Sequence, residues 1–135
     1  ALIDRCCSQT PPVAVVYADW KPADAPSPRE ILNEAIIAQS PAVLIDTYFK
    51  SRGTLFGVWP EDDLKRFITE VRVANLPLVL AGSLRGEEIQ RAARLGPTLV
   101  AVRGAACLGG RSGRLSETRV NQLCRLIRAA QAVSG

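Results

Sequence analysis

The chain has 135 residues, the length of one domain, and its 47% hydrophobic and 22% charged residues are typical of a folded globular protein. No apolar run is long enough to span a membrane and no signal-peptide pattern is visible, so we expect a cytoplasmic protein that does not contact a membrane. The net charge of +4 comes mainly from arginines without interleaved aromatic residues. This pattern argues against nucleic-acid binding and favours a basic pocket for small phosphorylated substrates.

Buried strands and amphipathic helices alternate along the sequence. Residues 1–12 are predicted to be the tail of a preceding helix, and four βα units in a single domain follow over 13–135. Short apolar, β-branched runs predict strands buried on both faces, at 12–18, 41–46, 76–83 and 97–104. Stretches with helical periodicity predict helices at 27–39, 60–75, 85–96 and 116–133.

Capping signals support the helix boundaries. Ser27, Pro28 and Glu30 have the spacing of a capping box with proline at the first helical position. Gly96 is placed to close the third helix, and Ser116 is placed to cap the last one. Strands that alternate with helices through short loops predict a parallel α/β sheet. Two architectures fit this pattern: an open doubly wound sheet of four strands, and half of a (β/α)8 barrel.

The types of residue present limit the available chemistry. The four cysteines, Cys6, Cys7, Cys107 and Cys124, show no C-x-x-C spacing and the chain contains no histidine, so a zinc site is not expected. Such cysteines suit a reducing cytoplasm. Without histidine, any acid–base catalysis falls to Lys, Asp, Glu or Tyr. Neither a G-x-G-x-x-G motif after the first strand nor a P-loop is present, which disfavours a dinucleotide or ATP fold.

Ligands of parallel α/β proteins bind beyond the carboxyl ends of the strands. The third and fourth strand ends are rich in glycine and carry Gly82, Ser83, Arg103 and Gly104. Their free backbone N–H groups and the following helix N-termini could cradle a phosphate group. The alternative is that these glycines only make tight turns.

The first two strand ends bring carboxylates and lysines together. The first carries Asp19, a candidate substrate contact, and the second carries Asp46 and Lys50. A lysine withdrawn from water at such a site can form a Schiff base or transfer protons, and a nearby carboxylate can orient it. The alternative is that Lys50 is a solvated loop lysine and Asp46 a turn residue.

Several stretches, taken in order, resemble one family. "VLIDTYFKSRGTLF", "LVLAGSLRGEEI" and "VAVRGAACLGGRSGRLS", and more loosely "VVYADWKPADAPSP", occur in the order and spacing seen in the (5-formylfuran-3-yl)methyl phosphate synthases. The resemblance runs from about residue 13 to about residue 128 and implies a (β/α)-barrel enzyme of methylofuran-type cofactor biosynthesis.

The resemblance implies a class I aldolase-like carbon–oxygen lyase. Such an enzyme condenses two molecules of glyceraldehyde 3-phosphate through a lysine imine, with loss of water and one phosphate, and uses neither a metal nor an organic cofactor. Asp46 and Lys50 carry over as catalytic residues, with Lys50 as general acid–base rather than as the imine lysine. The turns after the last two strands carry over as phosphate contacts, which are Gly82, Ser83, Arg103, Gly104 and Ala105.

Two departures from the family pattern shape the expectation. The family is about twice as long as this chain, and its imine-forming lysine lies on early strands that are not in this sequence. The family reads "GGDR" where residues 109–112 read "GGRS", so an acidic residue is missing. We therefore expect the C-terminal half of a barrel that is an incomplete catalyst alone and pairs with an N-terminal half or with a second copy. The alternative is a non-catalytic phosphosugar-binding half barrel.

Overall fold

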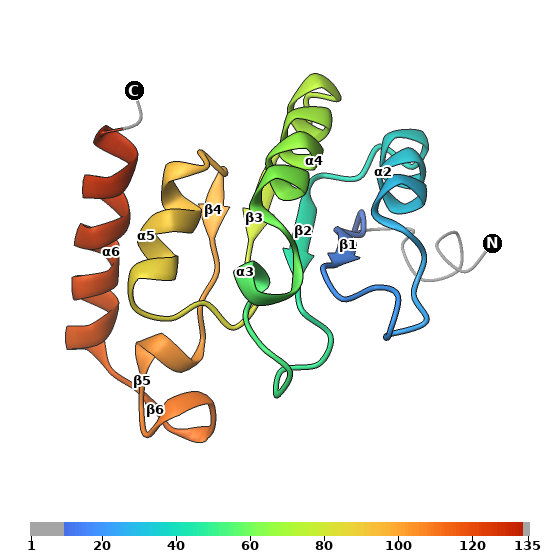
Figure 1. Ribbon diagram of the computed structural model, residues 1–135. Coiled ribbons are helices and arrows are strands. Elements are labelled where there is room, and N and C mark those ends of the chain that lie inside the picture. The colour runs from blue at the N-terminus through green and yellow to red at the C-terminus, as the bar shows by residue number, and fades with distance from the viewer. Residues whose placement is uncertain (1–9, 134–135) are drawn as a thin grey trace.

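The structure is a computed structural model that describes residues 10–133. Its centre is a parallel sheet of four strands in sequential order (Figure 1), and the strands are β1 (Ala14–Tyr17), β2 (Val43–Asp46), β3 (Leu78–Leu80) and β4 (Leu99–Val100). The main helices are α2 (Pro28–Ile37), α4 (Glu61–Val73), α5 (Glu87–Arg94) and α6 (Glu117–Ala132). The predicted alternation and the parallel sheet are confirmed, with each element shorter than its predicted range.

The caps predicted from the sequence define the helix ends. The Ser27 side chain accepts the backbone N–H of Glu30, and the Glu30 carboxylate accepts the backbone N–H of Ser27 in return, which completes a capping box. Gly96 follows α5 with a φ of 69°, the left-handed conformation that suits glycine there. Pro60 lies at the N-cap of α4. Ser116 caps α6 by accepting the backbone N–H of Arg119.

The hydrophobic core lies between the helices and one face of the sheet. Val16, Val43, Ile45, Leu78 and Leu80 are buried there against apolar side chains of α2, α4 and α5. Because right-handed crossovers between strands in sequential order place every helix on the same side, the opposite face receives no helix from these units.

The prediction that the strands are buried on both faces is therefore wrong for this chain. Along β2 and β3, fully buried residues alternate with half-buried ones, among them Leu44 and Val79. Leu99, which pairs with Val79, is 61% exposed. Strand order, rather than the composition of each apolar run, decides which face is covered. The sequential order suits consecutive units of a (β/α)8 barrel. The half barrel itself stays a prediction.

A small hairpin between β4 and α6 was not predicted. It contains η1 (Gly104–Ala106), β5 (Cys107–Leu108), η2 (Gly110–Ser112) and β6 (Arg114–Leu115), and β5 pairs antiparallel with β6. The hairpin requires glycine at 113, because a Cβ there would lie 1.6 Å from the carbonyl oxygen of Leu108. The short helix α3 (Leu55–Val58), between β2 and α4, was also missed.

The remaining predictions concern the chain's start and its thiols. Residues 1–9, with the proposed helix tail and with Cys6 and Cys7, lie outside the described residues. Among the described residues, Cys107 is a buried free thiol and Cys124 an exposed one. Over 10–133, no helix has both the length and the apolar character to cross a membrane. Nor do three or more His, Cys, Asp or Glu side chains of this part gather closely enough to hold a metal ion.

Candidate functional site

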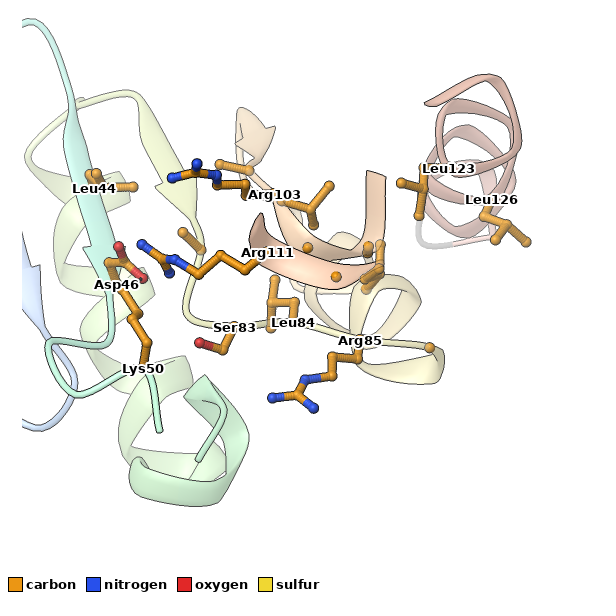
Figure 2. Close-up of a pocket in the computed structure, with 18 residues that line it drawn as sticks. Leu44, Asp46, Lys50, Ser83, Leu84, Arg85, Arg103, Arg111, Leu123 and Leu126 are labelled. Atoms are coloured by element: carbon orange, nitrogen blue, oxygen red, sulfur yellow. Dashed lines mark ion pairs between the residues drawn. The ribbon is translucent and has the colours of Figure 1, made fainter. Parts of the chain in front are cut away.

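A cavity of about 810 Å³ lies at the carboxyl ends of β2, β3 and β4 and extends to α6. Its charged side chains are Asp46, Lys50, Arg85, Arg103 and Arg111, and Ser83, Gly104 and Ala105 lie in its wall (Figure 2). Apolar side chains complete the lining, and they include Leu44, Leu84, Ile89, Leu123 and Leu126. Six of the eight residues predicted for the site therefore border one cavity.

Lys50 and Asp46 form an ion pair at the rim of this cavity. The Lys50 Nζ lies 2.6 Å from Oδ1 of Asp46 and also donates a hydrogen bond to the backbone carbonyl of Thr47. Oδ1 of Asp46 accepts the backbone N–H of Thr47 at 2.7 Å as well. Their side chains are 29% and 26% exposed, so both are partly withdrawn from water yet accessible from the cavity. The pair is thus a fixed amine–carboxylate unit that can exchange protons with a bound molecule.

The segment that carries Lys50 is held by a carboxylate from the neighbouring strand end. Asp19, which is 7% exposed, accepts the backbone N–H groups of Tyr48 at 2.7 Å and Phe49 at 2.9 Å. Burial alone would raise the pKa of Asp19, but these backbone donors outweigh burial and hold the pKa below its ordinary value. Asp19 does not line the cavity. Its carboxylate is occupied by the chain itself, so its observed role is to fix the position of the Lys50 segment.

Gly82 also lies behind the cavity wall rather than in it. Its φ is 109°, and a Cβ at this position would lie 2.9 Å from the Cβ of Leu55. Its carbonyl accepts the backbone N–H of Leu55 at 2.8 Å, which ties the start of α3 to the turn after β3. In this structure Gly82 packs closely against Leu55, and its role as a phosphate contact stays a prediction.

The other predicted phosphate contacts face the cavity from two turns. Ser83 adopts a φ of 55°, unusual for a residue other than glycine, at the turn after β3. Gly104 and Ala105 belong to η1, directly after Arg103. Their role as phosphate contacts stays a prediction, and their position at the carboxyl end of the sheet is compatible with it.

Two arginines of the cavity were not among the predicted site residues. Arg85 follows the turn after β3, and Arg111 lies in η2. A basic residue inside a glycine-rich turn at a strand end is a signal that could have found Arg111. The lining thus holds four basic side chains and one carboxylate, and such an imbalance concentrates anions in a cleft.

The fold and the cavity define an α/β protein with a mainly basic pocket at the carboxyl ends of its strands. Residues 3–124 match the profile of the 4-HFC-P synthase family, and the chain belongs to that family. The resemblance inferred from the motifs is thereby confirmed.

Curated relatives carry the name (5-formylfuran-3-yl)methyl phosphate synthase. Those from Methanobrevibacter smithii and Methanocaldococcus jannaschii are 35% and 34% identical to this chain, in both cases over 116 residues. The relative from Methanococcus aeolicus is 36% identical over 116 residues. Each match covers 84% of this chain and 49% of the relative, so the chain spans about half the length of the curated relatives it matches.

Proposed function

We propose that this chain forms the proton-transfer and phosphate-binding half of a (5-formylfuran-3-yl)methyl phosphate synthase, a class I aldolase-like lyase. The observation that carries the proposal is the ion pair of Lys50 and Asp46, 2.6 Å apart, at the rim of a cavity whose other charged residues are all basic. The substrate proposed is glyceraldehyde 3-phosphate, two molecules of which are joined with loss of water and one phosphate.

In this proposal Lys50 acts as general acid–base. Its Nζ already contacts two acceptors, the Asp46 carboxylate and the Thr47 carbonyl, which fix its direction. The Lys50 ammonium delivers a proton to an oxygen that leaves as water, and Lys50 thereby loses its positive charge. The neighbouring Asp46 carboxylate stabilises the ammonium form of Lys50. A positioned acid–base group of this kind contributes a factor of about 10² to 10⁴ in rate.

The imine is proposed to form on a lysine outside this sequence. Family membership and the half-length match support this assignment, since the part of the relatives outside the match is about as long as the matched part. The companion is proposed to be an N-terminal half of the barrel, or a second copy of the chain that completes the strand set. The half-buried sheet face at Leu44 and Val79 is where such a companion would pack.

The test is product formation from glyceraldehyde 3-phosphate, followed by mass spectrometry, with and without a polypeptide that carries the first half of a relative. Lys50→Ala is expected to lower the rate of product formation at least about 100-fold. Lys65→Ala is the matched control, because Lys65 is an exposed lysine of α4 that pairs with Glu61 away from the cavity. An unchanged rate in Lys50→Ala would rule out the proposed role.

Borohydride reduction in the presence of glyceraldehyde 3-phosphate tests the assignment of the imine. The adduct is expected only when the companion polypeptide is present, and on a lysine of that companion. If peptide mapping places the adduct on Lys50, then Lys50 is the imine lysine and the proton-transfer role is wrong.

A further inference from the structure

Three arginines of the cavity, Arg85, Arg103 and Arg111, have guanidinium groups without a partner within the described part of the chain, and Figure 2 shows Arg85 apart from the other two. Arg103 and Arg111 both line the cavity, and over residues 10–133 neither guanidinium makes a hydrogen bond, an ion pair or a ring contact. Other arginines of the protein do find acceptors: Arg72 and Arg119 donate to backbone carbonyls, and Arg91 pairs with Glu61. The free donors of Arg103 and Arg111 are therefore available to a ligand in the cavity.

The backbone of the hairpin directs Arg111 into the cavity. Gly109 and Gly110 have φ values of 80° and 79°, the left-handed conformation that turns the chain back on itself. The turn then packs against η1, since a Cβ on Gly104 would lie only 3.4 Å from the backbone nitrogen of Arg111. Figure 2 shows the Arg103 and Arg111 side chains extending the same way, toward β2.

Among the described residues, neither guanidinium forms an ion pair with a carboxylate. The one carboxylate in the lining, Asp46, already pairs with Lys50. Leu44 and Ala101 also line the cavity and contribute only apolar side chains. Two like charges that reach across such a surface are stabilised by an anion between them. A guanidinium matches an oxyanion well, because its planar N–H groups can bind two oxygens at once.

We propose that Arg103 and Arg111 together bind one phosphate group, as a second phosphate position in the cavity. The first position is the predicted cradle, limited to the turn of Ser83 and Gly104, and this proposal moves Arg103 from that cradle to the second position. In Figure 2 Ser83 lies on the side of Arg111 away from Arg103. The cavity then accommodates two phosphate groups at once, either on one bisphosphate or on two phosphorylated molecules. The proposal rests on the proposed function for the identity of the substrate, but not for the phosphate position itself.

Titration of the full chain with inorganic phosphate tests the site, by calorimetry at constant ionic strength so that screening does not vary. The wild type is expected to bind two phosphate ions. Arg111→Gln and Arg103→Gln are each expected to keep the first ion and to weaken the second at least about tenfold. The affinity of Arg111→Lys for the second phosphate ion is expected to lie between that of these variants and that of the wild type, because lysine keeps the charge and loses the planar donors.

Arg114→Gln is the matched control. Arg114 is an exposed arginine of β6, three residues from Arg111, and it does not line the cavity. The same change of net charge there is expected to leave both phosphate affinities unchanged. Three results would overturn the proposal: a single phosphate in the wild type, an unweakened second phosphate in Arg111→Gln, or equal weakening in Arg114→Gln.

This titration separates failure of the site from failure of the proposed function. Phosphate binding requires no turnover, so a second phosphate that depends on Arg111 stands even if no furan product forms. Conversely, product formation that depends on Lys50, without a second phosphate, would refute the arginine site and leave the proposed function intact. Retention of the first phosphate in each variant shows that the cavity has folded.

Discussion

The carboxylate of Asp19 accepts the backbone N–H of Tyr48 at 2.7 Å, so the end of β1 holds the segment that follows β2. The second carboxylate oxygen takes the N–H of Phe49, and Lys50 is the next residue. A buried carboxylate from one βα unit thus fixes the lysine of another. This contact between strand ends fixes the backbone next to Lys50, and contact of Asp19 with a substrate stays a prediction.

Asp19→Asn should lower the free energy of unfolding at pH 7 by about 1.5–3 kcal/mol, because the amide accepts with one oxygen and carries no charge. The bonds hold the pKa of Asp19 below the ordinary value of 3.8, so their contribution is complete above that pH and is lost as the pH falls further. Urea unfolding at pH 7 and near pH 3 should therefore show that the difference in free energy of unfolding between wild type and variant becomes smaller at the lower pH. Asp62→Asn, an exposed carboxylate of α4, serves as control. A pH-independent difference would contradict this account.

Gly82→Ala should destabilise the fold. The substitution strains a backbone with a φ of 109° by about 1–3 kcal/mol and forces its Cβ to 2.9 Å from the Cβ of Leu55, which adds a similar overpacking penalty. Gly57→Ala is the control, because its φ is ordinary and its Cβ would lie 3.7 Å from the Thr54 hydroxyl. That variant should be neutral or slightly more stable. Equal melting temperatures for the two variants would show that the contact with Leu55 relaxes freely.

Thr47→Val should increase stability. The Thr47 hydroxyl is fully buried and has no hydrogen-bond partner in the described residues, and a buried hydroxyl without a partner is unfavourable by about 1–3 kcal/mol. Valine keeps the branched shape and removes the unsatisfied group. Thr69→Val provides the comparison, because the Thr69 hydroxyl donates to the Lys65 carbonyl at 2.9 Å. Chemical denaturation of both variants checks the expectation, and a loss of stability in Thr47→Val would reveal a partner for that hydroxyl.

Leu80→Ala should reduce the free energy of unfolding by about 2–5 kcal/mol, since Leu80 is fully buried between the sheet and the helices. Val73→Ala should change it by less than about 0.5 kcal/mol, because Val73 is 84% exposed at the end of α4. Urea-induced unfolding of each variant and of the wild type measures both changes in the free energy of unfolding. A small effect at Leu80 would mean that the core between β3 and α4 is not closely packed.

Apolar runs and caps were sufficient to predict the four strands, the four main helices and their order. They were not sufficient for the hairpin of β5 and β6, because its two-residue strands flank a glycine-rich turn and do not lie within a longer apolar run, as β4 does. The need for glycine at 113 arises from the Leu108 carbonyl, which is a contact in space rather than a local pattern. Coverage of a single sheet face likewise follows from strand order, which no individual run encodes.

The site was predictable where its residues lie close in sequence. Asp46 and Lys50 are four residues apart, and their pairing could be read from the chain. The partners of Asp19 lie 29 and 30 residues away, so no local pattern could predict that backbone N–H groups bind its carboxylate. The direction of Arg111 depends on two left-handed glycines and on the packing of η1, and it could not be inferred from the letters "GGRS".

The sequential order of β1 to β4 has a consequence for how the protein can change. The turns at the rim of the cavity follow three different strands, while the hydrogen-bond ladder of the sheet involves only the strands. A turn such as 109–113 can therefore be exchanged without altering strand register, and ligand preference and folding can vary independently. The turns at the rim can thus vary in sequence while the four-stranded sheet below them stays the same.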